Sequence, residues 1–246
     1  MSALVLPTAA LPVAEKFGPT LQGEGPSAGR LALFLRLGAC NLNCRWCDTP
    51  YTWDGRRFDL RKEITRTPVA ELVEWLAAQP HALVVLTGGE PLLHQKTDGW
   101  RALMAVLRHT TRSVEIETNG TLVPAPVTLA VPRLVFNVSP KLANSGVRAS
   151  RRIVPEAMEK FAELAFAAGH RARFKFVATG PADLEEIEEI VSRYVIPPHA
   201  VWVMPEGTTP EATTEVARDL AEHVIGRAWN LTLRQHVLLW PGERTR

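Results

Sequence analysis

The 246-residue sequence predicts an α/β fold in which about seven strands alternate with helices to form a parallel sheet, an open or complete barrel. Three observations support this. Short apolar runs alternate with stretches of helical spacing. No linker, repeat or low-complexity segment divides the chain, so a single domain over residues 1–246 is expected. Glycine-rich or polar segments follow the apolar runs, as at the carboxyl ends of parallel strands, where such sheets bind ligands.

The first half of the chain supplies the first two strands and the helices that follow them. Residues 31–37 (LALFLRL) are a continuous apolar run that predicts a buried strand leading into a cysteine-rich loop. Apolar residues at helical spacing predict a helix over 68–78, and the run 82–87 predicts a strand that ends at a Gly-Gly-Glu-Pro turn. A further helix is expected over 100–108.

The second half continues the alternation. Short strands are expected at 114–117 and 134–138, and residues 173–179 alternate as a strand does. The remaining expected elements are helices over 155–168, 184–194 and 211–229 and strands over 201–203 and 231–237.

Composition excludes several classes of function. The hydrophobic share of 46% and charged share of 22% are ordinary for a soluble globular protein. A net charge of +2 is too mild to indicate a nucleic-acid or anionic membrane partner. Residues 1–14 lack the basic start of a signal peptide, and no apolar run approaches the roughly 20 residues of a membrane span. Three clustered cysteines suit a reducing cytoplasm rather than a disulfide framework.

Cys40, Cys44 and Cys47 are the only cysteines, and they lie together in CNLNCRWC. Three thiolates within so short a segment indicate one metal site. A four-iron cluster that only carries electrons normally takes four thiolates, so three would leave one iron open to bind an organic cofactor. The alternative is a zinc site with Asp48, or a distant His94 or His236, as fourth ligand.

The C-x3-C-x2-C pattern after the first expected strand, with Trp46 before the third cysteine, resembles the radical S-adenosylmethionine (SAM) superfamily. The Gly-Gly-Glu-Pro segment at the end of the next strand strengthens this resemblance. It implies that the three cysteines bind a [4Fe–4S] cluster and that SAM chelates the open iron. It also implies that the reduced cluster cleaves SAM to methionine and a 5′-deoxyadenosyl radical.

Three polar segments at expected strand ends have both a structural and a functional interpretation. Residues 88–91 (GGEP) could be a strand-to-helix turn, or their carbonyls and carboxylate could hold the amino group of SAM. Residues 117–120 (ETNG) could be a tight turn or could contact a ribose or pterin edge. Residues 139–141 (SPK) could be a solvated loop or could contact a ligand.

Three features near the first expected strand also have both a structural and a functional interpretation. The glycines of residues 17–25 (FGPTLQGEG) could punctuate a loop, or could let its backbone approach a flat heterocycle. Arg36 is a charge inside an apolar strand and needs an anion, either a structural carboxylate or a substrate carboxylate. Thr49 precedes Pro50, so it could cap a helix or could ligate Mg²⁺ beside the cysteines.

Together these segments resemble the 7-carboxy-7-deazaguanine synthase family of the queuosine pathway. The match runs nearly end to end and rests on TLQGEG at 20–25, CNLNCRWCDT at 40–49, TGGEP at 87–91, ETNG at 117–120, SPK at 139–141, MPEG at 204–207 and HVLLW at 236–240. The resemblance implies conversion of 6-carboxytetrahydropterin to 7-carboxy-7-deazaguanine with loss of ammonia, SAM being re-formed. It implies an incomplete (β/α) barrel of the radical SAM type, a homodimer, and a flavodoxin- or ferredoxin-type electron donor.

The resemblance also assigns residues. Residues 1–30 form a substrate-binding extension, and Thr49 holds the required Mg²⁺. No side chain is assigned a catalytic acid or base role. Substrate contacts fall on Leu21, Gln22, Gly23, Arg36 and Thr87. SAM contacts fall on Trp46, Cys47, Asp48, Gly88, Gly89, Glu90, Glu117, Asn119, Ser139, Pro140, Lys141, Met204, Pro205, Glu206 and Gly207.

The sequence departs from the family pattern near its C-terminal end. Gln235 is adjacent to His236, where many members place the glutamine two residues before the histidine. The tail at 242–246 is short and charged, and a substrate contact by the chain terminus is not carried over. Two other classes remain: a radical SAM enzyme that activates a partner protein, against which TLQGEG argues, and a non-enzymatic zinc module, against which GGEP argues.

Overall fold

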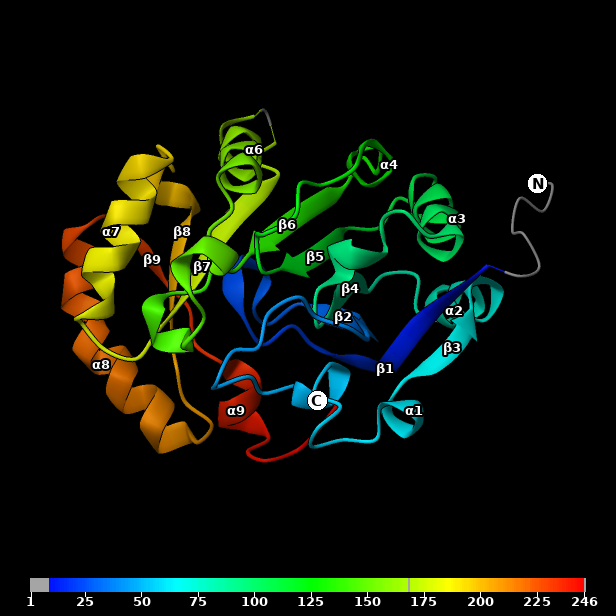
Figure 1. The fold of residues 1–246 in the computed structure, drawn as a ribbon, viewed down its shortest axis with the longest axis horizontal. Helices are drawn as coiled ribbons and strands as arrows, with labels where there is room; N and C mark the ends of the chain where they lie inside the picture. Colours follow the sequence, from blue (N-terminus) through cyan, green and yellow to red (C-terminus); the bar gives the residue numbers. More distant parts are fainter. Residues whose placement is uncertain (1–8, 168, 246) are drawn as a thin grey trace.

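The computed structural model describes residues 9–167 and 169–245, which form one curved sheet with helices along its outer side (Figure 1). The sheet has nine strands in the order β3-β1-β2-β4-β5-β6-β7-β8-β9. Its two end strands, β3 and β9, do not pair with each other, so the barrel stays open, as the family resemblance implied. Residues 1–8 lie outside the described residues. They belong to the predicted N-terminal extension (1–30) and to the segment (1–14) that lacks the features of a signal peptide.

The elements have the following bounds. The strands are β1 Ala10–Leu21, β2 Leu31–Leu37, β3 Thr65–Pro68, β4 Leu83–Gly88, β5 Val114–Thr118, β6 Leu134–Val138, β7 Ala172–Ala178, β8 Val201–Pro205 and β9 Asn230–Leu231. The α-helices are α1 Leu60–Glu63, α2 Val69–Ala77, α3 Asp98–Leu107, α4 Pro126–Leu129, α5 Ala149–Arg152, α6 Pro155–Phe166, α7 Asp183–Arg193, α8 Pro210–Gly226 and α9 Gln235–Leu239. Short 3-10 helices are η1 Gly25–Ser27, η2 Pro50–Thr52, η3 Pro91–His94, η4 Ala143–Ser145 and η5 Pro198–Ala200.

The predicted alternation of strands and helices is confirmed from β2 to α8. Seven strands, β2 and β4 to β9, lie next to one another in this order and are all parallel. The long helices begin where their sequences predict. Thr97 caps α3 by accepting from Trp100 N, and Thr209 caps α8 by accepting from Ala212 N with Pro210 next. None of the described helices combines the length and apolar character needed to cross a bilayer.

The sequence did not predict two strands of the sheet, and one strand that it did predict is wrong for most of its length. β1 and β3 extend the sheet in antiparallel fashion, so residues 17–21, interpreted as a loop, belong to a strand. The predicted strand over 231–237 is limited to Asn230–Leu231, and α9 follows it. The chain leaves the sheet there because its polar groups bond to the loop after β1 instead. Gln235 N donates to Gly23 O at 2.8 Å, and Gly25 N donates to Thr232 Oγ1 at 2.9 Å.

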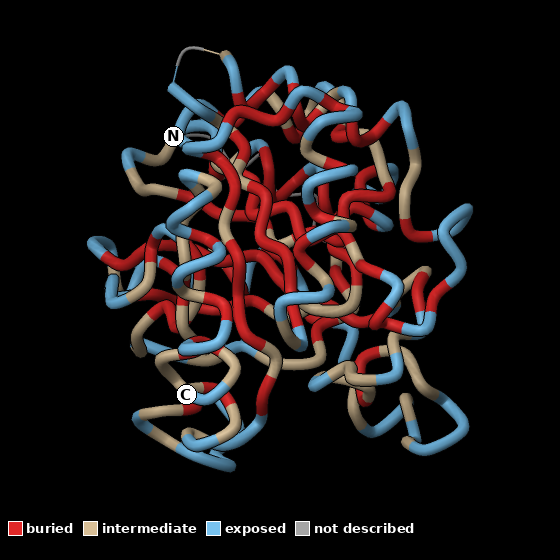
Figure 2. Tube along the Cα trace, turned by 90° about the vertical axis from the view of Figure 1, so that its left-hand side faces the viewer, coloured by how far each residue is buried: buried red, intermediate tan, exposed pale blue. Residues whose placement is uncertain are grey.

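The two faces of the sheet differ in chemistry because strand side chains alternate. Outward residues such as Leu35, Leu86 and Ile116 pack against the helices in the main apolar core. Figure 2 shows the buried residues running through the middle of the molecule, with half-buried and exposed residues around them. Several inward positions are polar or charged, among them Arg36 and Lys175. A polar interior at one end of a barrel prepares that end for ligands.

Candidate functional site

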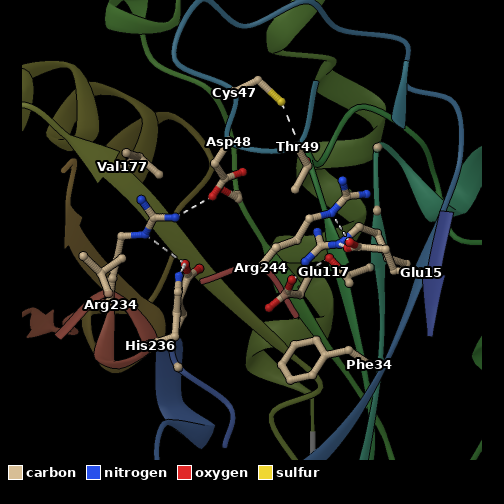
Figure 3. A pocket seen from close by; sticks show the side chains of 18 of the residues that line it. Glu15, Phe34, Cys47, Asp48, Thr49, Glu117, Val177, Arg234, His236 and Arg244 are labelled. Carbon is tan, nitrogen blue, oxygen red and sulfur yellow. Dashed lines mark hydrogen bonds and ion pairs between the residues drawn. The ribbon is translucent and has the colours of Figure 1, made fainter. Parts of the chain in front are cut away.

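A pocket with a cavity volume of about 470 Å³ lies at the carboxyl ends of the parallel strands (Figure 3). It is large enough for small organic ligands. Most residues predicted for the site line it: Leu21, Gln22, Gly23, Arg36, Cys40, Cys44, Trp46, Cys47, Asp48, Thr49, Thr87, Gly88, Gly89, Glu117, Asn119, Ser139, Lys141, Met204 and Glu206. Four predicted residues are not among those that line it: Glu90, Pro140, Pro205 and Gly207. The structure therefore brings all the predicted segments together, although not every side chain.

The three cysteines are free thiols, half-buried, and all face this pocket. Burial raises the pKa of the Cys40 thiol to about 11, and burial also raises the pKa of Cys44. Trp53 Nε1 lies 3.4 Å from Cys47 Sγ, and Leu42 N donates to Cys40 Sγ at 3.4 Å. Three soft thiolate donors opening onto one cavity suit an iron–sulfur cluster.

A single zinc ion is the alternative occupant of the cysteine loop. Within residues 9–167 and 169–245, no three His, Cys, Asp or Glu side chains converge closely enough to hold one ion. A tetrahedral zinc with Zn–S bonds of about 2.3 Å would require such convergence. His94, offered as a fourth zinc ligand, is buried and lies 2.9 Å from the carbonyl of Gly38 through Nε2.

The cysteine loop is braced by the loops after the neighbouring strands. Asn119 Nδ2 donates to Asn41 Oδ1 at 2.8 Å, and Trp46 Nε1 donates to Asn144 Oδ1 at 3.1 Å. Lys141 Nζ lies 5.4 Å from the centre of the Trp46 ring. The turn after β4 presses on the same loop, because a Cβ at Gly89 would lie 2.1 Å from the carbonyl oxygen of Ala39. Only glycine fits so close an approach.

Glu90 is fully buried, and both carboxylate oxygens are occupied by protein donors. Oε1 accepts from Leu92 N at 3.0 Å and from Thr118 Oγ1 at 2.8 Å, while Oε2 accepts from Asn119 N at 2.7 Å. Burial raises the pKa of this carboxyl. The side chain therefore joins the turns after β4 and β5, and the pocket wall at this turn is made by Gly88 and Gly89.

Thr49 stands at the position that precedes η2, as its sequence predicts for a cap, but its side chain makes no capping hydrogen bond. Its Oγ1 lies 3.8 Å from Cys47 Sγ and lines the pocket (Figure 3). The hydroxyl oxygen is therefore left free of the capping role, in reach of the pocket.

Glu117 lies among residues predicted to contact the substrate. Its Oε2 accepts from Thr87 Oγ1 at 2.7 Å, and its Oε1 accepts from Gln22 Nε2 at 3.2 Å. Gln22 is 1% exposed, and its Oε1 accepts from Glu24 N at 3.3 Å, which fixes the orientation of its amide. Beneath it, buried Glu115 accepts from Asn137 Nδ2 at 3.0 Å. These hydrogen-bonded residues form a polar floor that joins the loop after β1 to β4, β5 and β6.

Arg36 makes an ion pair that the sequence did not identify. Its Nε donates to Glu15 Oε2 at 2.8 Å, and Tyr51 OH donates to the same oxygen at 2.8 Å. Arg244, in the C-terminal tail, donates to the other oxygen of Glu15, and its guanidinium carbon lies 3.8 Å from the Tyr51 ring centre (Figure 3). The tail therefore closes one side of the pocket. Glu15 escaped detection because β1 was not recognised.

A second charged group on the opposite wall was also missed. Glu24 accepts from Lys175 Nζ and from Arg234 Nε, and Arg234 also donates to Asp48. Burial alone would raise the pKa of Glu24, but the nearby charges of Lys175 and Arg234 lower it below its usual range. Lys175 could have been found by the signal that marked Arg36, a cation within an alternating apolar strand. Arg234 carries no such signal.

Gly23 allows the C-terminal segment to approach this wall. A Cβ there would lie 2.3 Å from Nδ1 of His236, so the histidine ring occupies the space that a side chain would need. His236 Nε2 lies 3.9 Å from Glu24 Oε1. Burial lowers the pKa of this histidine.

Comparison with known proteins identifies relatives of the whole chain. Residues 36–191 match the model of the radical SAM superfamily. The chain is 36% identical to a 7-carboxy-7-deazaguanine synthase of Pyrobaculum aerophilum, over 92% of this chain and 93% of the relative. It is 30% identical to the enzyme of that name from Escherichia coli strain K12, over 93% and 97% of the two chains. The crystal structure of QueE from Escherichia coli superposes with a TM-score of 0.67 at 28% identity, covering 92% of this chain and 95% of that one.

Proposed function

The chain belongs to the 7-carboxy-7-deazaguanine synthase family of the radical SAM superfamily, and on this premise we propose that its substrate is 6-carboxytetrahydropterin, which it converts to 7-carboxy-7-deazaguanine with loss of ammonia. The observation that carries this proposal is that one pocket joins the cysteine loop to the TLQGEG loop. A zinc module would not need the second loop, and an enzyme that activates a protein would not need a polar floor for a small heterocycle.

Members of the radical SAM superfamily use a [4Fe–4S] cluster and SAM, which together supply the radical that starts the reaction. Cys40, Cys44 and Cys47 would hold the cluster. We assign the SAM side of the pocket to the cysteine loop, to the Gly88–Gly89 backbone, to Ser139 and Lys141, and to the segment after β8. Glu90 would act there by shaping the turn, since its oxygens are already occupied.

The pterin side is assigned to the opposite part of the same pocket. Leu21, Gln22 and Gly23 would present backbone groups to the edge of the ring, supported by Thr87 and Glu117. Arg36 would face the substrate carboxylate. Because the floor is hydrogen-bonded before any ligand enters, binding would need little rearrangement, which favours a defined orientation of the substrate.

Mg²⁺ would be held by Thr49 together with substrate and water oxygens. Mg²⁺ takes few protein ligands and prefers oxygen, and the Thr49 hydroxyl is free of any capping bond. Thr49 and Arg36 both line this pocket, so a carboxylated substrate would meet both the ion and the guanidinium there.

Three further family properties remain predictions: a single catalytic domain, a homodimer and a flavodoxin- or ferredoxin-type donor in a reducing cytoplasm. The continuous nine-stranded sheet supports the first. The donor is supported by two exposed cations that would attract an acidic redox protein: Arg45 in the cysteine loop, and Arg151, which donates to Asn41 O and Asn43 Oδ1 of that loop. The three free thiols suit the compartment.

The test is anaerobic turnover by the reconstituted enzyme with 6-carboxytetrahydropterin, SAM, Mg²⁺ and a reductant. We expect 7-carboxy-7-deazaguanine and ammonia in equal amounts, with SAM consumed in much smaller amount. Tetrahydropterin without the carboxylate is the matched control and should give no product. Absence of product from the carboxylated substrate, in enzyme with a complete cluster, would refute the proposed substrate.

A further inference from the structure

Arg234 joins three parts of the pocket wall that are far apart in the sequence. It lies between β9 and α9, and its side chain is only 9% exposed. Its Nε donates to Glu24 Oε1 at 3.2 Å, and its Nη1 donates to the carbonyl oxygen of Gly207 at 2.8 Å. Its Nη2 donates to the Asp48 carboxylate, and a dashed line joins the two side chains in Figure 3. One guanidinium therefore touches the loop after β1, the cysteine loop and the segment after β8.

The backbone around Arg234 is already attached to the first of these parts. Gln235 N donates to Gly23 O, and Gly25 N donates to Thr232 Oγ1. These bonds hold the base of the arginine against the loop at 22–25. The side chain then reaches outward to Asp48 and Gly207. A shift of Asp48 or of the Gly207 carbonyl would therefore also shift the loop at 22–25. The arginine side chain can follow either acceptor only if its own backbone moves, and that backbone is bonded to the loop.

The charges around the guanidinium make this connection stiff. Glu24 is shared by Lys175 and Arg234, so it is held from two directions. Asp48 is 54% exposed, and within residues 9–167 and 169–245 its only ion pair is with Arg234. The planar fork of a guanidinium can serve three acceptors at fixed angles, whereas the single ammonium of a lysine cannot span the same three positions.

We propose that Arg234 is a positioning residue that couples the binding of SAM to the binding of the pterin. This rests on the proposed function, in which Asp48 and Gly207 lie on the SAM side and residues 22–25 lie on the pterin side. SAM that settles against Asp48 and against Glu206, beside Gly207, would hold Arg234 in place and, through Glu24, would hold the loop at 22–25 in the arrangement that receives the pterin. By linkage, the pterin raises the affinity for SAM by the same factor.

The experiment measures that factor on cluster-loaded enzyme without reductant, so that no turnover occurs. Anaerobic calorimetry gives the Kd of 6-carboxytetrahydropterin with and without saturating SAM. We expect the wild type to bind the pterin at least about fivefold more tightly with SAM present, the lower end of usual coupling. Arg234→Met should bring this ratio close to one, and Arg234→Lys should retain only part of it.

A second readout does not depend on ligands. Amide hydrogen exchange in the cluster-free protein should become faster in Arg234→Met over residues 22–25 and 47–49 together. The matched control is Arg227→Met, which removes an arginine that pairs with exposed Glu188 outside the pocket. That control should leave both the exchange and the coupling ratio as in the wild type.

The outcomes separate the coupling from the proposed function. An unchanged ratio in Arg234→Met, even with a lower melting temperature, would show a structural brace only and overturn the proposal. A wild-type ratio of one, or equal losses in Arg227→Met, would also overturn it. Failure of the wild type to bind the pterin at all would instead refute the proposed function, and the coupling with it.

Discussion

Glu15 and Arg36 are cross-strand neighbours on β1 and β2, and Arg36 Nε donates to Glu15 Oε2 at 2.8 Å. The pair lies in the pocket wall, with side chains 7% and 18% exposed. Tyr51 and Arg244 bind the same carboxylate. Glu15 thus balances the charge of Arg36 before any ligand enters, and the guanidinium is held at a defined angle.

We expect Arg36→Ala to weaken pterin binding roughly ten- to hundredfold, because a charge-assisted hydrogen bond contributes about 1.5–3 kcal/mol. Arg36→Lys keeps the charge but loses the planar fork, so it should recover only part of the affinity. The measurement is the Kd of the substrate for the three proteins, with the Kd of SAM as control. Equal substrate affinity with a lower melting temperature for Arg36→Ala would show that the arginine serves only its ion pair with Glu15.

Each of Cys40, Cys44 and Cys47 should be required for a complete cluster, since the sequence contains no other cysteine to replace a lost ligand. Single alanine variants, reconstituted anaerobically, should contain well under four irons and four sulfides and should not cleave SAM. The control is Thr49→Ala, which should assemble the cluster normally. A cysteine variant with a full cluster and intact SAM cleavage would contradict the assignment.

Thr49→Ala should raise the Mg²⁺ concentration that gives half-maximal rate by roughly tenfold, equivalent to about 1.4 kcal/mol for one lost oxygen ligand. Thr49→Ser keeps the hydroxyl and should stay close to the wild type. The measurement is a Mg²⁺ titration of the initial rate at fixed cluster content. The same half-maximal concentration in wild type and alanine variant would remove Thr49 from the ion.

Acid should destabilise the cluster-free protein partly through His94. Burial lowers the pKa of this side chain, so around its ordinary value of 6.5 the unfolded chain binds more protons than the folded protein. The neutral, buried His94 therefore contributes to the unfolding free energy above about pH 6.5. This contribution is lost as the pH falls toward the lowered pKa of the folded protein. Denaturant unfolding between about pH 7.5 and 5.5 should show a smaller loss of unfolding free energy in His94→Gln than in the wild type.

The upper limit for His94 is about 1.4 kcal/mol per pH unit, the effect of one proton. Glutamine can still donate to the Gly38 carbonyl, so the variant should fold. The matched control is His81→Gln, which changes an exposed histidine and should keep the wild-type pH dependence. Identical pH dependence in wild type and His94→Gln would contradict this prediction, because it would mean that His94 has the same pKa in the folded and the unfolded protein.

Local patterns were enough to predict most of the fold and many residues of the pocket. Apolar runs such as 31–37 and 134–138 correspond to strands because each is buried on both faces, which needs no knowledge of its neighbours. The prediction of the final strand was wrong because the structure of that segment depends on its neighbours. A strand was expected over residues 231–237, yet the chain bonds there to the loop after β1, more than 200 residues earlier, and forms α9.

The sequence by itself determined the cysteine loop, the strand-end motifs and the family, because each depends on spacings of a few residues within one segment. The tertiary structure alone decided which charges meet. Glu15 reaches Arg36 because an unrecognised strand pairs with β2, and Arg234 reaches Glu24 and Asp48 because the sheet curves until its last segment meets its first. Such pairings depend on the closure of the whole sheet, and side-chain charges at long separation carry no local pattern that would reveal them.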